Sequence, residues 1–218
     1  YAKGEHAMTK KGILFDMDGT LINTYENINF RQALSELKTV QKTLILKILK
    51  SRVRSFAEME TRILQEVEDP AEGKELVRRV SDFLLEHYDN APLKKDALMF
   101  LQYVKQKNYK ICLCTNNATE IVSHILREKH MEAYFDYVIT SQQVTRSKPD
   151  PQMYLEALHN IDLTAEECIV FEDTENGVMA ARNAGIDVIV VNDKEKRKYS
   201  DALMTIRDFG DYRLYQEF

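Results

Sequence analysis

Short runs of apolar residues recur along the chain, and segments with helical periodicity separate them. Five runs are continuous rather than alternating: Gly12–Phe15, Ile111–Cys114, Tyr137–Ile139, Cys168–Phe171 and Val188–Val191. Strands that are buried on both faces of a parallel sheet have this pattern. Amphipathic segments fill the gaps at residues 94–107, 117–130, 150–160 and 175–184. This alternation predicts an α/β domain with a Rossmann-like central parallel sheet and helices on both of its faces.

Residues 23–90 interrupt the alternation, because they show helical periodicity and no strand pattern. Four amphipathic helices in this region are enough to form a small bundle. The insertion is too long for an ordinary crossover between strands. We therefore expect residues 23–90 to form a helical cap domain and residues 8–22 and 91–218 to form the α/β core. The alternative is that these helices only cover one face of the sheet.

Composition limits the class of protein further. The 218 residues are 44% hydrophobic, which excludes a wholly disordered chain. A net charge of −5 has the wrong sign for a protein held mainly by nucleic-acid phosphates or by an anionic membrane. No stretch predicts a membrane span, the N-terminus shows no apolar core followed by a small-residue cleavage site, and 3 cysteines do not make a disulfide framework. We expect a cytoplasmic protein, a monomer or weak dimer, without nucleic-acid or membrane partners.

Polar side chains follow four of the predicted strands, directly after three of them and through a short loop after the run at Tyr137–Ile139, which leads to Lys148. These residues are Asp16, Asp18, Thr115, Asn116, Lys148, Glu172 and Asp173. The carboxyl ends of parallel strands form the ligand-binding edge of an open sheet, so we expect these side chains to meet. Carboxylates that are brought together repel one another unless a cation joins them. Oxygen ligands of this kind favour Mg²⁺, which also takes phosphate oxygens.

Each of these residues also has an ordinary structural explanation. The aspartates before Gly19 are common turn formers, and Thr115 could cap the helix that follows it. Lys148 could be a solvated surface lysine, and Glu172 with Asp173 could favour the positive end of a helix. Each explanation is adequate for one residue. Together, at the ends of four strands, they do not account for the grouping.

Four ordered motifs resemble the haloacid dehalogenase superfamily, in the branch that carries a helical cap after the first strand. The motifs are Asp16-Met17-Asp18-Gly19-Thr20, Thr115-Asn116, Lys148-Pro149-Asp150-Pro151, and Phe171-Glu172-Asp173 with the downstream Gly177 and Gly185. The resemblance covers residues 12–191, with a divergent cap. Within the superfamily, the chain is similar to phosphoglycolate phosphatase and to beta-phosphoglucomutase-like phosphatases. The resemblance implies a phosphatase that acts on a small phosphorylated metabolite through an aspartyl-phosphate intermediate.

The resemblance also implies a role for each catalytic residue. Asp16 is the expected nucleophile, and Asp18 is the expected general acid and then general base. Lys148 would neutralise charge on the phosphate during the transfer. The Thr115 hydroxyl and the Asn116 backbone N–H would hold the oxygens of the transferring group.

For the metal, the resemblance implies that Mg²⁺ is the cofactor. Asp16 and Asp173 would contribute carboxylate oxygens, and Asp18 would contribute its backbone carbonyl. Glu172 would bind the ion directly or through water.

Other reaction classes are less well supported by the residues. Dehalogenases of the family lack a carboxylate at the position of Asp18, because a halide leaves without a proton. Mutases related to beta-phosphoglucomutase carry a histidine ten positions beyond it, where this chain has Ile28. A non-catalytic binding protein would have no need for all of the charged motif residues. Substrate selection is expected in the cap, where Arg52 or Arg54 could bind a second anionic group.

Overall fold

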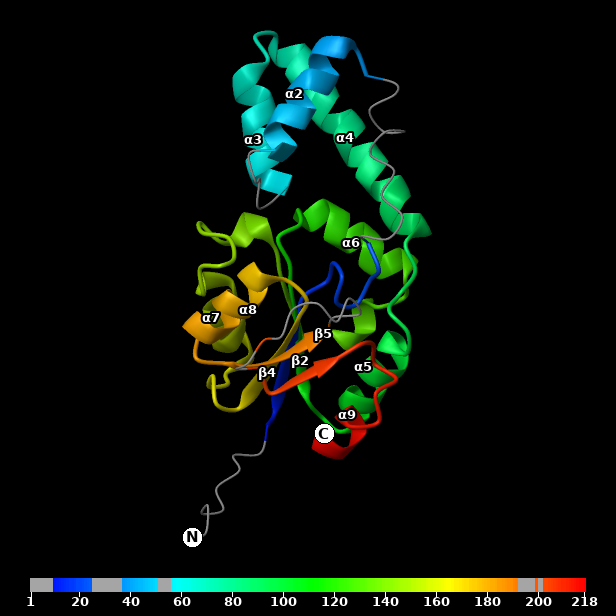
Figure 1. Cartoon of the computed structure of the whole chain (residues 1–218), viewed down its shortest axis with the longest axis vertical. Helices are drawn as coiled ribbons and strands as arrows, with labels where there is room; N and C mark the ends of the chain where they lie inside the picture. The colour runs from blue at the N-terminus through cyan, green and yellow to red at the C-terminus, as the bar shows by residue number, and fades with distance from the viewer. Residues whose placement is uncertain (1–9, 25–36, 51–55, 192–198, 200–201) are drawn as a thin grey trace.

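The computed structural model describes residues 10–24, 37–50, 56–191, 199 and 202–218. Its centre is a parallel sheet of six strands in the order β3-β2-β1-β4-β5-β6 (Figure 1). The strands are β1 (Gly12–Phe15), β2 (Lys110–Cys114), β3 (Tyr137–Ile139), β4 (Cys168–Glu172), β5 (Asp187–Val191) and β6 (Met204–Ile206). The predicted α/β fold with a parallel sheet is therefore confirmed. The sequence pattern missed β6, because a half-exposed strand of three residues is too short to show a period.

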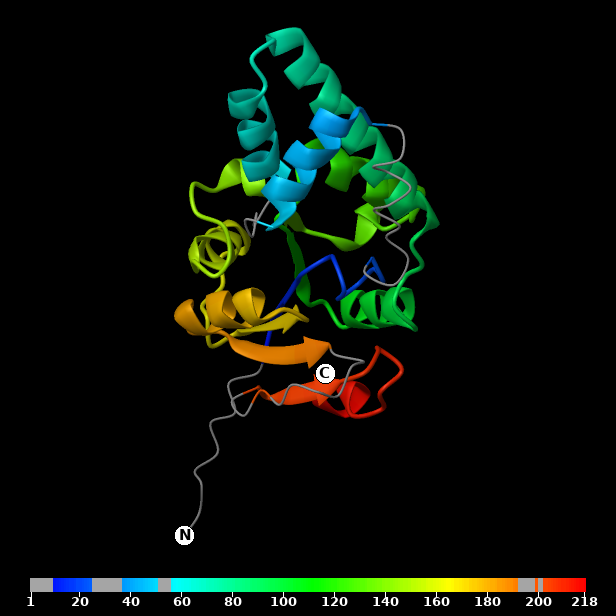
Figure 2. The same ribbon diagram turned by 45° about the horizontal axis from the view of Figure 1, so that its top comes forward.

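Both faces of the sheet are buried, which explains why the strands read as continuous apolar runs. In β1, Ile13 and Phe15 belong to one hydrophobic cluster and Leu14 to the other, since successive side chains point to opposite faces. The cluster of Ile13 includes residues of α5 (Ala97–Gln106), α6 (Thr119–Glu128) and α9 (Leu214–Glu217). The cluster of Leu14 includes residues of α7 (Gln152–Ile161) and α8 (Glu175–Asn183). The helices thus cover both faces, as Figure 2 shows from a second angle.

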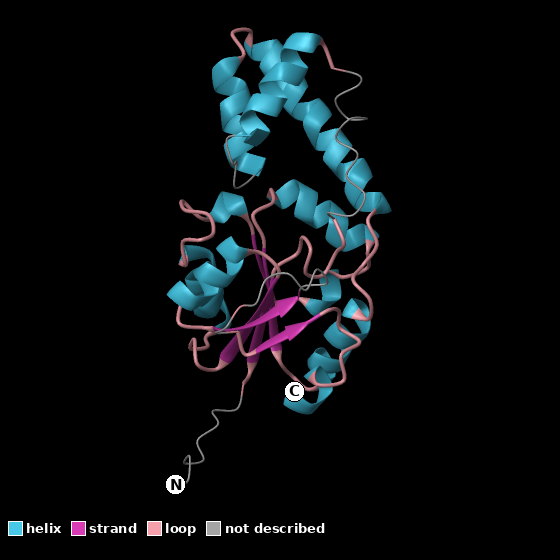
Figure 3. Ribbon diagram, viewed as in Figure 1, coloured by secondary structure: helices cyan, strands magenta, loops and turns pink. Residues whose placement is uncertain are grey.

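Three helices between β1 and β2 are grouped at one end of the molecule (Figures 1 and 3). They are α2 (Thr39–Lys50), α3 (Phe56–Glu66) and α4 (Pro70–Asn90). These helices share a small hydrophobic cluster that includes Ile45, Ile63 and Leu76. Residues 25–36 of the predicted cap lie outside the described residues. The division into a cap of residues 23–90 and a core stays a prediction.

Two short segments connect this helical group to the sheet, and they lie side by side. The backbone N–H of Asn23 donates to the carbonyl of Pro92 at 2.8 Å, and that of Lys94 donates to Leu21 at 2.8 Å. The helix α3 also approaches η2 (Ser141–Gln143), a single 3₁₀ turn after β3, and α4 packs on α6. A further 3₁₀ turn, η1 (Glu132–Tyr134), precedes β3. The helical group is therefore positioned over the loops that follow the strands.

Within the described residues, no helix combines the length and the apolar character that crossing a membrane requires.

Candidate active site

The first functional segment begins where β1 ends. Asp16 continues the ladder, because its backbone N–H donates to the carbonyl of Phe171 at 2.9 Å. Gly19 then adopts a φ of 79°, a left-handed conformation that glycine tolerates best, and the chain turns back above the sheet. This turn holds the nearly buried carboxylate of Asp16 at the carboxyl edge of the sheet.

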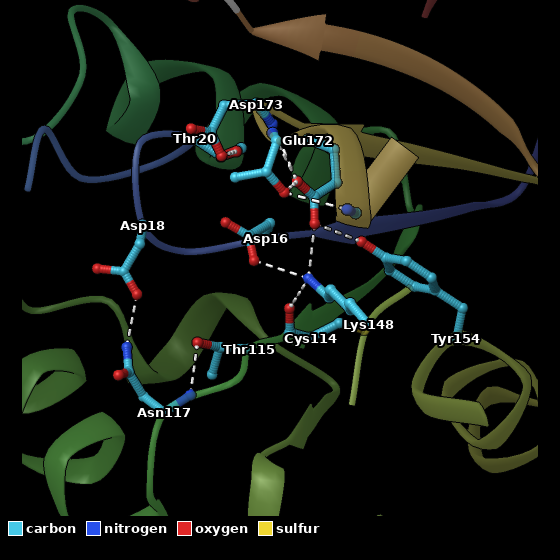
Figure 4. Close-up of polar contacts among 12 residues, drawn as sticks. Asp16, Asp18, Thr20, Cys114, Thr115, Asn117, Lys148, Tyr154, Glu172 and Asp173 are labelled. Carbon is cyan, nitrogen blue, oxygen red and sulfur yellow. Dashed lines mark hydrogen bonds and ion pairs between the residues drawn. The ribbon is translucent and has the colours of Figure 1, made fainter. Parts of the chain in front are cut away.

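Lys148 lies at the centre of the site and is buried with only 2% of its surface exposed. Its ammonium group donates to Asp16 Oδ1 at 2.7 Å, to Glu172 Oε1 at 2.7 Å and to the carbonyl of Cys114 at 2.8 Å (Figure 4). An ammonium group has three donors, so all of them are used. Residues from β1, β2 and β4 are therefore joined through one buried cation, as expected for side chains at one sheet edge.

Glu172 is fully buried and its carboxylate accepts five hydrogen bonds. Its Oε1 accepts from Lys148 and, at 3.0 Å, from the hydroxyl of Tyr154. Its Oε2 accepts from the backbone N–H groups of Asp173 at 3.0 Å and Thr174 at 3.2 Å, and from the Thr174 hydroxyl at 3.1 Å. A metal ion bound directly to Glu172 would have to compete with these donors. The geometry favours Glu172 as the residue that anchors Lys148, whereas its predicted metal contact stays a prediction.

In the part of the chain that the structure describes, the carboxylates around Lys148 form a cluster with more negative than positive charge. Ligand atoms of Asp16, Glu172 and Asp173 all lie within 4.8 Å of one another. Burial, reinforced by Glu172 and opposed by Lys148, raises the pKa of Asp16 to about 8. Burial together with Asp16 and Glu172 raises the pKa of Asp173 to about 9. One ammonium group therefore leaves the cluster able to accept either protons or a cation.

These residues fit the predicted magnesium ion. All of the donor atoms are carboxylate oxygens, which are ligands of hard divalent cations. A bound cation would favour the ionised carboxylates and lower their pKa values. It would therefore take the place of the protons that these carboxylates otherwise hold. Asp173 is further oriented by Thr20, whose hydroxyl donates to Asp173 Oδ1 at 3.4 Å.

Asp18 lies in a separate group of hydrogen bonds, and Figure 4 shows its carboxylate directed toward Asn117 rather than toward Asp16. The hydroxyl of Tyr88, in the last turn of α4, donates to Asp18 Oδ1 at 2.7 Å. The side-chain amide of Asn117 donates to Asp18 Oδ2 at 2.5 Å. Burial raises the pKa of Asp18, and the hydrogen bonds from Tyr88 and Asn117 oppose that shift. The two aspartates of the first motif thus have different surroundings, as opposite protonation states require.

The loop after β2 supplies a buried hydroxyl beside these carboxylates. The backbone N–H of Thr115 donates to Ile139 at 3.0 Å, and its hydroxyl accepts from the N–H of Asn117 at 3.2 Å. Asn116 lies between Thr115 and Asn117 in this loop. The predicted contacts of Thr115 and Asn116 with a phosphate stay predictions.

The structure adds three residues that the sequence did not single out. Tyr88 and Tyr154 belong to apolar helix faces, where an aromatic residue is usually part of the core. Asn117 directly follows the second motif, and this adjacency was the one available signal. Arg52 and Arg54, the predicted substrate contacts of the cap, lie outside the described residues.

Comparisons with known proteins agree with this geometry. A family profile described as haloacid dehalogenase-like hydrolase matches residues 13–191. A phosphorylated carbohydrates phosphatase from Thermotoga maritima is 32% identical, with 82% of this chain and 83% of the relative covered. The pyrophosphatase PpaX from Bacillus mycoides is 28% identical, with 83% of this chain and 82% of the relative covered.

A solved structure of a candidate beta-phosphoglucomutase from Thermotoga maritima superposes with a TM-score of 0.72. The two chains are 23% identical, and the superposition covers 95% of this chain and 99% of the other. At this identity, the likeness supports the fold alone.

The α/β fold and the buried cluster of carboxylates around a lysine agree with the class of hydrolase that the motifs predicted. The chain belongs to the haloacid dehalogenase-like hydrolases, since the matched region covers most of its length. The predicted family is thereby confirmed, and the chain is an enzyme of a family whose relatives named above are phosphatases.

Proposed function

We propose that this protein is a Mg²⁺-dependent phosphatase that hydrolyses a small phosphorylated metabolite through an aspartyl-phosphate intermediate. The observation that supports it best is the contact of Lys148 with Asp16 inside a cluster that also holds Glu172 and Asp173. A buried carboxylate beside a fixed ammonium group can attack phosphorus where positive charge neutralises the phosphate oxygens.

In the first step, Asp16 attacks phosphorus and the bond between phosphorus and the leaving oxygen breaks. Lys148 holds Asp16 Oδ1, so the orientation of the nucleophile is set before substrate binds. The Thr115 hydroxyl and the Asn116 N–H donate to the phosphoryl oxygens. Asp18 gives its proton to the leaving alcohol oxygen, which therefore departs as a neutral alcohol.

In the second step, Asp18 accepts a proton from water, whose oxygen attacks phosphorus. The bond between phosphorus and Asp16 breaks, which releases inorganic phosphate and restores the free carboxylate. Asp16, Asp173 and the carbonyl of Asp18 would hold Mg²⁺, with Glu172 nearby. When bound, that ion supplies positive charge that reduces repulsion between the phosphate and the carboxylates.

For the substrate, we propose a phosphorylated carbohydrate as the first class to test. The phosphatase from Thermotoga maritima, at 32% identity, is named for such substrates. Pyrophosphate is the second class, since the relative from Bacillus mycoides is named a pyrophosphatase. A phosphosugar mutase is the alternative reaction, but Ile28 stands at the position where mutases carry a cap histidine. Dependence of turnover on a sugar bisphosphate would favour that alternative.

The test is phosphate release from sugar phosphates, pyrophosphate and 4-nitrophenyl phosphate, with Mg²⁺ or with EDTA. We expect release with Mg²⁺ and none with EDTA. Asp16→Asn should abolish release without loss of helical content. Asp187→Asn is the matched control, because Asp187 begins β5 at the opposite edge of the sheet and pairs with Lys10 at the surface. Normal turnover by Asp16→Asn would contradict the nucleophile assignment.

A further inference from the structure

We propose that Tyr88 is a positioning residue for Asp18, and that Tyr88 and Asn117 together set the direction in which Asp18 delivers its proton. The proposal rests on the proposed function, in which Asp18 is the general acid. According to this proposal, the rate of proton transfer from Asp18 depends on the Tyr88 hydroxyl, which belongs to the helical cap region.

The three side chains form a closed triangle of hydrogen bonds. Tyr88 Oη donates to Asp18 Oδ1 at 2.7 Å, and Asn117 Nδ2 donates to Asp18 Oδ2 at 2.5 Å. Asn117 Nδ2 also donates to Tyr88 Oη at 2.8 Å. Each oxygen of the carboxylate therefore has its own donor, and both hydrogens of the amide are used. Rotation of the Asp18 carboxylate would break at least one of these bonds, so the triangle fixes its plane.

Tyr88 can impose this direction because its own position is fixed. Tyr88 is 5% exposed and belongs to the hydrophobic cluster that also contains residues of β1, α5 and α6. Lys129, directly after α6, donates to the carbonyl of Asp89 in the last turn of α4 at 2.9 Å and to that of Ala91, which follows the helix, at 2.8 Å. His124 of α6 is paired with the Asp89 carboxylate at 2.8 Å. These bonds attach the final turn of α4 to α6 and to the residue that follows α6, and they therefore fix the position of the Tyr88 hydroxyl.

A second contact secures the same turn from the other side. The ring nitrogen Nε2 of His87 lies 2.8 Å from the carbonyl oxygen of Thr24, in the segment that leads out of the catalytic loop. The two chain segments that bound the cap region are therefore joined next to Asp18. Because these contacts hold the last turn of α4, the Tyr88 hydroxyl in that turn is suited to orient a neighbouring group.

A purely structural role for Tyr88 predicts a different outcome from a positioning role. Tyr88→Phe keeps the ring in its cluster and removes only the hydroxyl. If the hydroxyl only satisfies a buried polar group, the variant should lose some stability and lose activity equally on all substrates. If it orients Asp18, the loss should depend on how much the leaving group needs a proton.

The experiment compares kcat/KM for phenyl phosphate and 4-nitrophenyl phosphate, which have the same ring but leaving groups of very different acidity. For Tyr88→Phe we expect a loss of about 10- to 100-fold with phenyl phosphate, the size expected of a misplaced catalytic group. With 4-nitrophenyl phosphate, whose phenolate leaves without a proton, we expect less than about a 3-fold loss. Asn117→Ala should show the same selectivity, and the double variant should lose less than the product of the single losses.

Tyr103→Phe is the matched control, since among the described residues its half-buried hydroxyl donates to the carbonyl of Tyr215 at 3.5 Å and takes no part in the hydrogen bonds around Asp18. It should leave both substrates unchanged. Equal losses on both substrates for Tyr88→Phe, or no loss on either, would overturn the proposal. Absence of Mg²⁺-dependent turnover in the wild-type protein would instead overturn the proposed function, so the two failures are distinguishable.

Discussion

Gly177 offers a sharp test of how the site is anchored. It is the third residue of α8, and a Cβ atom added there would lie 1.8 Å from the carboxyl carbon of Glu172 and 1.8 Å and 2.1 Å from its oxygens. Ordinary contacts between such atoms are about 3.5 Å, so Gly177→Ala must displace the Glu172 carboxylate by more than about 1 Å. Glu172 accepts five hydrogen bonds, among them the bond from Lys148.

The expected magnitude follows from two opposing effects. In an unstrained helix interior, replacing glycine with alanine stabilises the fold by about 1 kcal/mol. Breaking a buried ion pair such as that of Glu172 and Lys148 destabilises it by about 3–5 kcal/mol. The free energy of unfolding should therefore fall by about 2–4 kcal/mol in Gly177→Ala, or about 4–16 °C in Tm for a chain of this size. Turnover should fall by at least about 100-fold, because Lys148 loses its anchor.

Denaturant unfolding and phosphate release measure both effects. Gly73→Ala is the matched control, because Gly73 also lies inside a helix and its added Cβ would lie 3.3 Å from Leu64 Cδ2 and 3.6 Å from Val67 Cβ. It should change the unfolding free energy by less than about 1 kcal/mol, with unchanged turnover. If Gly177→Ala is as stable and as active as the wild-type protein, Glu172 can move without releasing Lys148, and the anchoring role is wrong.

Two further predictions concern the same cluster. Tyr154→Phe removes one donor to Glu172 but keeps the ring, whose centroid lies 5.0 Å from the Lys148 ammonium nitrogen, so kcat should fall by about 3- to 10-fold with little change in KM; an unchanged kcat would contradict a role for the hydroxyl. The raised pKa values of Asp16, about 8, and Asp173, about 9, mean that the folded protein retains protons that the unfolded chain releases above pH of about 4. With EDTA, the stability that these carboxyls contribute should fall as pH rises from about 4 and should be lost once pH passes the folded pKa values of about 8 and about 9, and Mg²⁺ should raise Tm more at pH 8 than at pH 5. An equal Mg²⁺ shift at both pH values would count against this carboxylate site.

Local patterns in the sequence predict the sheet and the segments that carry the site. The strands β1, β2, β4 and β5 contain apolar runs buried on both faces, and parallel topology brings the polar groups that follow the strands to one edge. The contact of Lys148 with Asp16 is therefore foreseeable from strand order, although 132 positions separate the two residues. The short strand β6 is not foreseeable, because three residues, of which one is buried, are too few to show a period.

The site roles that sequence reasoning missed depend on contacts between different elements of the fold. Tyr88 reaches Asp18 over 70 positions, and only the packing of α4 on α6 brings its hydroxyl there. Tyr154 lies on the buried face of α7. Its ring packs in the hydrophobic core, whereas its hydroxyl donates to Glu172. Glu172 was expected beside the metal. Two of the hydrogen bonds to its carboxylate come from Thr174, the residue directly before α8, and the sequence did not predict them. Such roles follow from side-chain geometry rather than from spacing in the chain.

The central claim is that Asp16 carries the phosphoryl group during turnover, and trapping that group tests it most directly. The protein is mixed with ³²P-labelled 4-nitrophenyl phosphate and Mg²⁺, quenched with acid within the first turnovers, and digested for peptide analysis. We predict label on the peptide that contains Asp16, released by hydroxylamine as expected of an acyl phosphate, and absent from Asp16→Asn. Rapid phosphate release by the wild-type protein with no such label at any quench time, or with the label on another residue, would contradict it.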